Sequence, residues 1–175
     1  MSKFTLNEED LQIEVKDAIN ATKFDDASHG LSHCMKAVDF IVERPDCYLF
    51  IEFKDPQNPG SAAQRQGVFQ QNFLRGKLDQ DLQYKYRDSF LFEWAEGRAD
   101  KPIDYLVLIA LDSLTAAHLL TRTEDLKRKL PVQKSTSSPW KRPFVRSCAV
   151  FNLAAWNGKL PDLPVTRLSA KGRTV

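Results

Sequence analysis

Three charged side chains, Asp39, Glu52 and Lys54, lie in two short apolar segments. Burying an acid or an amine in such a segment costs folding free energy unless the group has a partner or a function. Glu52 and Lys54 are two residues apart, so on a β-strand both project from the same face. A two-residue turn at positions 45–46 sets a strand register that places Asp39 opposite Glu52. Cross-strand carboxylates, with Cβ atoms roughly 5 Å apart, repel each other unless a cation or a proton lies between them. The pattern therefore predicts a divalent-cation site beside an amine.

A second acid, Asp46, is nearer to Glu52 in the sequence and directly follows Pro45. In the register above it lies at the turn, six residues from Glu52. An extended strand of that length spans roughly 20 Å, so the two carboxylates could not bind one ion. We therefore assign Asp39 as the first acid.

Asp39, a spacer of twelve residues and the run Glu52-Phe53-Lys54 resemble the PD-(D/E)XK nuclease superfamily, whose fold is also called restriction-endonuclease-like. The resemblance covers roughly residues 6–112 and implies an α/β fold with a central mixed β-sheet flanked by α-helices. It implies a Mg²⁺ (or Mn²⁺) ion held by Asp39, Glu52 and the backbone carbonyl of Phe53. In such a site the metal acidifies a bound water and stabilises charge on the phosphate, while Lys54 orients or deprotonates that water.

The same resemblance points to two further residues. Many members place a Glu on the first helix as an additional metal or water ligand, and Glu14 takes this place at the border of the apolar stripe of an expected helix. The alternative for Glu14 is a solvated residue on the flank of that helix. Members often carry a Gln or a Lys near the nucleophile, on the helix after the E-x-K strand. Gln83 is the preferred candidate there, and Lys85 is the second.

Hydrophobic periodicity and turn signals predict the elements that position these residues. Thr5 and Glu8 form a capping-box pattern before the first expected helix, and Gly76 interrupts a long helical region. In chain order we expect a helix at about 6–21, a hairpin with strands at 33–43 and 47–55, a helical region at about 62–96, a buried strand at 103–112, a helix capped by Ser113 over 113–131 and a strand over 147–156. This order predicts a mixed sheet flanked by helices.

Length and composition are those of an ordinary globular protein, with 175 residues that are 42% hydrophobic and 27% charged, so we expect a single domain over residues 1–175. The longest apolar run, Tyr105 to Leu111, is too short to cross a bilayer, and the first residues lack the apolar core of an export signal, which favours a cytoplasmic protein. The three cysteines have no C-x-x-C spacing, so we expect them reduced and buried, with no structural zinc.

Positive charge gathers in the C-terminal third of the chain. Residues 122–175 hold 12 Lys and Arg against 3 acids, a net charge of +9, whereas residues 1–121 hold 13 against 20, a net charge of −7. This asymmetry predicts contacts with nucleic-acid phosphates. The candidate binding residues are Lys141, Arg142 and Arg146, which alternate with aromatic side chains. The alternative is a set of solvated basic side chains spread over the surface.

Together these features predict a metal-dependent nuclease that hydrolyses phosphodiester bonds of nucleic acid, with DNA favoured over RNA. A homodimer is the form that could cut both strands of a duplex. The alternative is a non-catalytic module of the same fold that binds nucleic acid or protein. A degenerate member would normally lose one of the three site residues, and this chain keeps Asp39, Glu52 and Lys54, which favours the enzyme.

Overall fold

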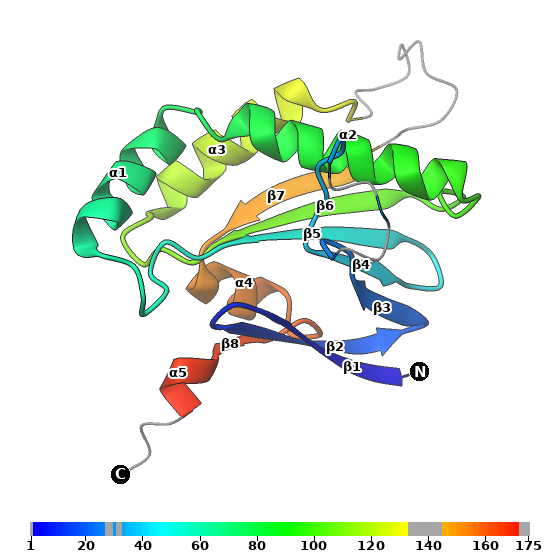
Figure 1. The fold of residues 1–175 in the computed structure, drawn as a ribbon, viewed down its shortest axis with the longest axis horizontal. Coiled ribbons are helices and arrows are strands. Elements are labelled where there is room, and N and C mark those ends of the chain that lie inside the picture. Colours follow the sequence, from blue (N-terminus) through cyan, green and yellow to red (C-terminus); the bar gives the residue numbers. More distant parts are fainter. Residues whose placement is uncertain (1, 27–29, 31–32, 133–144, 172–175) are drawn as a thin grey trace.

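The structure is a computed structural model, and it describes residues 2–26, 30, 33–132 and 145–171. The elements in chain order are β1 (Ser2–Glu8), β2 (Leu11–Ala18), β3 (Asn20–Lys23), β4 (Phe40–Glu43), β5 (Tyr48–Lys54), α1 (Ala63–Leu74), α2 (Asp79–Ala95), β6 (Ile103–Ile109), α3 (Ala116–Lys129), β7 (Ser147–Phe151), α4 (Leu153–Lys159), β8 (Val165–Arg167) and α5 (Leu168–Lys171) (Figure 1). Among the described residues, no helix is long and apolar enough to cross a membrane.

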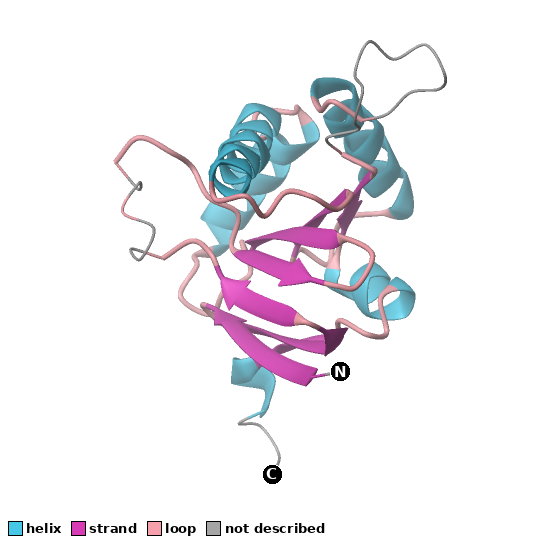
Figure 2. Cartoon of the chain, turned by 90° about the vertical axis from the view of Figure 1, so that its right-hand side faces the viewer, coloured by secondary structure: helices cyan, strands magenta, loops and turns pink. Residues whose placement is uncertain are grey.

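A five-stranded mixed sheet forms the middle of the molecule, in the order β3-β4-β5-β6-β7. Strand β4 pairs antiparallel with both β3 and β5, and β5, β6 and β7 run parallel. Helices α1 to α3 cover one face, while the small sheet β1-β2-β8 and helix α4 cover the other (Figure 2). The expectation of an α/β fold with a central mixed sheet flanked by helices is confirmed.

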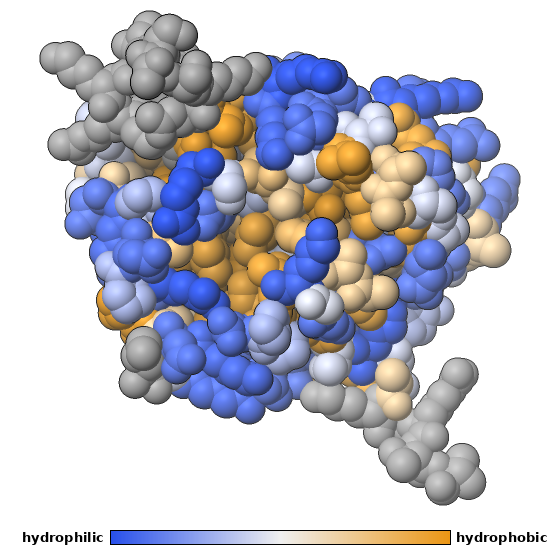
Figure 3. Space-filling view, turned by 180° about the vertical axis from the view of Figure 1, so that it is seen from behind, coloured by the Kyte–Doolittle hydropathy of each residue, from blue (hydrophilic) through white to orange (hydrophobic). Residues whose placement is uncertain are grey.

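Two apolar cores lie on the two faces of this sheet, and strand β5 contributes to both because its side chains alternate. Tyr48 and Phe50 pack toward the helices, while Leu49, Ile51 and Phe53 pack toward the small sheet and α4. By the same alternation the side chain of residue 52 points toward the helices. Seen from behind, apolar side chains gather at the centre of the molecule with charged ones around them (Figure 3).

The first predicted element, a helix at about residues 6–21, is wrong. The segment forms the antiparallel strands β1 and β2, which turn at Glu9, a residue with φ of 48°. Leu11, Ile13 and Val15 are fully buried and alternate with partly exposed residues, which is the two-residue period of a half-buried strand. The apparent capping acid, Glu8, is instead the last residue of β1.

The predicted hairpin and its register are confirmed, with Phe40 paired to Ile51 and the Arg44 N–H bonded to the Cys47 carbonyl (2.8 Å). Its first strand is shorter than predicted, because it begins at Phe40 rather than at residue 33. The interruption of the helical region is also confirmed, since Gly76 adopts a φ of +73° between α1 and α2. Cys47 and Cys148 are buried, as expected, whereas Cys34 is exposed.

Several boundaries in the C-terminal half differ from those predicted, and strand β6 ends at Ile109 rather than at residue 112. Helix α3 is capped by Thr115 rather than Ser113, because the Thr115 hydroxyl accepts a hydrogen bond from the His118 N–H (3.3 Å). The predicted strand over 147–156 ends at Phe151, where the Asn152 side chain caps α4 by accepting from the Ala155 N–H (2.8 Å).

Candidate active site

Asp39 and Glu52 meet on the face of the sheet that packs against α2. Continuing the β4–β5 register by one residue beyond Phe40 places Asp39 opposite Glu52, as the sequence predicted. The exposed fraction of Asp39 is 3% and that of Glu52 is 0%, although both are acids. Two buried carboxylates at adjacent positions of neighbouring strands are costly for the fold, so they need a compensating cation or a function.

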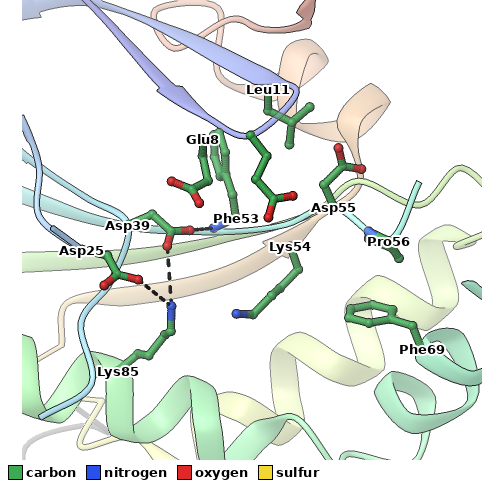
Figure 4. A pocket seen from close by; sticks show the side chains of 11 residues that line it. Glu8, Leu11, Asp25, Asp39, Phe53, Lys54, Asp55, Pro56, Phe69 and Lys85 are labelled. Carbon is green, nitrogen blue, oxygen red and sulfur yellow. Dashed lines mark hydrogen bonds and ion pairs between the residues drawn. The ribbon is translucent and has the colours of Figure 1, made fainter. Parts of the chain in front are cut away.

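Asp39 is held by hydrogen bonds to its side chain and to its backbone carbonyl. Its Oδ2 accepts a hydrogen bond from the Phe53 N–H (2.6 Å), which links it to the strand that carries Glu52. Its own carbonyl accepts from the Phe24 N–H (2.7 Å), which brings the segment after β3 to the site. Asp25 therefore lies next to Asp39 (Figure 4).

Two lysines supply positive charge to this acid pair. The Nζ atoms of Lys54 and Lys85 each lie 2.8 Å from Glu52 Oε1. Lys85 also approaches Asp39 Oδ1 (3.5 Å) and Asp25 Oδ2 (3.7 Å), as the dashed lines in Figure 4 show for these two aspartates. Its ammonium group thus lies between the two site carboxylates, on a side chain that is 13% exposed.

Burial dominates the electrostatics of the site. It raises the pKa of Asp39 to about 7, and the negative charge of Glu52 adds to this, while Lys85 and the Phe53 N–H oppose it. Burial also raises the pKa of Glu52 in spite of Lys54 and Lys85. Burial lowers the pKa of Lys85, but Glu52 and Asp39 outweigh it and the net change is upward, so Lys85 is a cation at neutral pH.

A pocket of about 310 Å³ opens beside these residues (Figure 4). Its acidic lining comes from four segments, with Glu8 and Glu9 at the end of β1 and in the turn after it, Asp25 after β3, Asp39 before β4 and Asp55 after β5. The remaining lining residues are Leu11, Phe53, Lys54, Pro56, Phe69 and Lys85. The pocket therefore presents carboxylate oxygens and ammonium groups side by side to a bound molecule or ion.

The oxygen atoms at this site suit a divalent cation that takes only some of its ligands from the protein. Asp39 and Glu52 offer hard carboxylate oxygens, and Glu52 Oε2 is buried yet accepts no hydrogen bond from the described residues. Across the described ranges, no group of three or more His, Cys, Asp or Glu side chains is close enough to hold a metal. Mg²⁺ commonly binds through one or two carboxylates and completes its shell with water and phosphate oxygens, so a pair of carboxylates is sufficient.

Two of the predicted site residues lie away from this pocket. Glu14 is on strand β2 rather than on a helix, and its carboxylate pairs with Lys3 (2.8 Å). The Gln83 amide donates to the Lys129 carbonyl (2.6 Å), on the α3 side of α2. Lys85, the second candidate on that helix, is the residue that reaches the carboxylates, since two residues along a helix turn a side chain by about 200°.

Additional acids at the site were not anticipated. Glu8, Glu9 and Asp25 line the pocket, and the first two come from the β1–β2 hairpin that replaces the predicted helix. The signal in the sequence was the polar run 7–10 between two segments with alternating apolar residues, which is typical of a hairpin.

The described basic residues of the C-terminal third are mostly paired with acids. Arg146 binds Asp104 through two nitrogens, and Arg167 binds Asp55 (2.7 and 2.8 Å). Arg122, Lys127, Arg128 and Lys129 also form ion pairs. Lys141 and Arg142 lie outside the described residues. Contacts between this third of the chain and nucleic-acid phosphates therefore stay a prediction.

Comparison with family models, with curated proteins and with solved structures found no match to this chain. A buried carboxylate pair, with an oxygen that accepts no hydrogen bond from the described residues, lies beside two ammonium groups and an open pocket. Such an arrangement can bind a cation, hold a water and neutralise a phosphate.

Proposed function

We propose that the protein is a metal-dependent nuclease of the restriction-endonuclease-like fold, which hydrolyses phosphodiester bonds of nucleic acid with Mg²⁺ or Mn²⁺. The observation that carries this proposal is the meeting of Asp39 and Glu52 on neighbouring strands, with Lys54 on the same strand as Glu52 and in contact with it (2.8 Å). The mixed sheet, with parallel strands following the E-x-K strand and helices on one face, supports it.

Each residue has a role that follows from its position. Asp39, Glu52 and the Phe53 carbonyl would hold the metal, which supplies an acidified water and neutralises charge on the phosphate. Lys54 lines the pocket with a side chain that is 27% exposed, so its ammonium can hold the attacking water or donate to a phosphate oxygen. The Phe53 N–H keeps the Asp39 carboxylate directed at strand β5.

The second candidate function is a non-catalytic binding module, and one observation favours it. Lys85 already places a positive charge between Asp39 and Glu52, so the carboxylate pair is compensated without a metal. In this case the two lysines and the carboxylates would form a buried ion-pair network whose role is structural.

Cleavage by purified protein separates these functions. We expect single-stranded DNA, duplex DNA or RNA to be degraded with Mg²⁺ or Mn²⁺ and to remain intact with EDTA. The variant Lys54→Met should lower the rate by about 10²–10⁴-fold, the usual contribution of a positioned proton-transfer group. Lys77→Met is the matched control, because Lys77 is exposed and lies outside the pocket. Equal cleavage by both variants would assign the activity to a contaminant or to another site.

A further inference from the structure

The ammonium group of Lys85 occupies the place where a cation shared by the two site carboxylates would bind. Its Nζ lies 2.8 Å from Glu52 Oε1 and 3.5 Å from Asp39 Oδ1. The other lysine, Lys54, also touches Glu52 Oε1, but its described ion pairs include no contact with Asp39. Among the described residues, Lys85 is thus the cation that contacts both Asp39 and Glu52.

The position of Lys85 is fixed by the packing of α2. Around it on this helix, Leu82, Tyr86 and Ser89 are buried against the sheet. The Leu82 carbonyl accepts from the Tyr105 hydroxyl (3.0 Å), and Ser89 Oγ accepts from the Val38 N–H (3.0 Å), one residue before Asp39. These hydrogen bonds hold α2 directly beside Asp39. The packing of the helix therefore determines where the Lys85 ammonium lies.

A third acid lies on the solvent side of the same ammonium. Asp25 Oδ2 is 3.7 Å from Lys85 Nζ, and its side chain is 50% exposed. It also lines the pocket, as Lys85 does. A small rotation of the flexible Lys85 side chain can therefore move its ammonium from the two buried carboxylates to Asp25. The ammonium keeps an ion-pair partner throughout.

We propose that Lys85 is a tethered cation that fills the metal position in the metal-free protein and moves toward Asp25 when the metal binds. A divalent ion and an ammonium cannot share the same two carboxylates, because like charges at that separation repel strongly. Lys85 therefore stabilises the metal-free fold and lowers the affinity for metal. This inference rests on the proposed function, since the competing ligand is the same divalent ion.

Removing the ammonium should change stability and metal affinity in opposite directions. In Lys85→Met, which keeps most of the side-chain volume, two buried carboxylates lose their bridging cation. We expect a lower urea midpoint in EDTA and at least a tenfold lower Kd for Mn²⁺. A lysine with a merely structural role would lower both the stability and the metal affinity, because a loosened site binds metal less well.

Titration with Mn²⁺, followed by the electron paramagnetic resonance of the free ion, measures this affinity for wild type, Lys85→Met and the exposed control Lys77→Met. Tighter binding by Lys85→Met alone supports the inference. Equal or weaker binding by a folded Lys85→Met overturns the inference and leaves the proposed function standing. No binding by any of the three proteins overturns both.

A second measurement needs no variant of Lys85 and so does not depend on its folding. Wild-type protein is treated with an amine-acylating reagent with and without Mn²⁺, and modification of each lysine is measured by peptide mass spectrometry. We expect Mn²⁺ to raise the labelling rate of Lys85 several-fold, because the displaced ammonium becomes more exposed, and to leave Lys77 unchanged. An unchanged rate at Lys85 under saturating Mn²⁺ would overturn the inference.

Discussion

Replacing Asp39 by Asn should stabilise the metal-free protein at neutral and alkaline pH. Burial raises the pKa of Asp39 from its ordinary 3.8 to about 7, so between these values the folded state holds a proton that the unfolded state has lost. Wild-type stability attributable to this group therefore decreases as the pH rises from about 4 to about 7. At about 1.4 kcal/mol per pKa unit, the full loss has a ceiling of about 4 kcal/mol.

The neutral amide avoids this loss and keeps an oxygen that can accept from the Phe53 N–H, which bonds Asp39 Oδ2 in the wild type (2.6 Å). We expect the free energy of unfolding of Asp39→Asn to equal that of wild type near pH 4 and to exceed it by about 2–4 kcal/mol above pH 7. Urea denaturation in EDTA at several pH values measures this difference. Asp112→Asn is the matched control, because Asp112 is exposed and lies outside the pocket.

A difference between Asp39→Asn and wild type that does not vary with pH would refute this reasoning, and so would a less stable variant at pH 8. The same variant should bind no Mn²⁺ at the site, since one of its two carboxylates is gone. Gained stability and lost metal binding together would show that the fold retains Asp39 at a cost to its own stability, which is typical of a functional residue.

Three further predictions concern the fold and the charge. Gly76→Ala should cost about 1–3 kcal/mol of stability in urea denaturation, because Gly76 has a φ of +73° and an added Cβ would lie 2.9 Å from Arg122 Nη2. Gly97→Ala, with a φ of +74° but open space around it, should cost less. Arg167→Ala should lower stability by about 2–4 kcal/mol, because it leaves the buried Asp55 carboxylate without its two-nitrogen partner; a loss below 0.5 kcal/mol would contradict this. The affinity for duplex DNA should fall as the salt concentration rises, and the slope of log K against log salt concentration should be roughly −0.9 per neutralised phosphate. An affinity that does not change with salt would exclude phosphate contacts by the basic third of the chain.

The hairpin and its register could be predicted because local chemistry decides them. Two short apolar segments flank a Pro-Asp turn, so the pairing that places Asp39 opposite Glu52 follows from the turn length alone. The break at Gly76 is likewise local, since a left-handed residue ends α1.

The first element was missed because its apolar residues fit two periods. Leu11 and Val15 are four residues apart, as on a helix, but Ile13 between them completes an alternating pattern. The strand is favoured by a distant partner, since β2 pairs with β8 near the C-terminus, with Leu11 opposite Arg167. A pattern read within one segment does not contain that contact.

The choice between Gln83 and Lys85 depended on the rotation of α2 about its axis. That rotation is set by the packing of Tyr86 and Leu82 against strand β6 and by the hydrogen bond from Tyr105 to the Leu82 carbonyl. None of these contacts is local in sequence, so the apolar stripe alone favoured Gln83, which borders it.

Diffraction from crystals soaked in Mn²⁺, recorded at a wavelength where manganese scatters anomalously, tests the central claim most directly. We predict one anomalous peak bound by the carboxylates of Asp39 and Glu52 and the carbonyl of Phe53, with the Lys85 ammonium moved toward Asp25. Crystals that keep Lys85 between the two carboxylates and show no manganese there, at a concentration saturating for any metal-dependent cleavage in solution, would contradict the account.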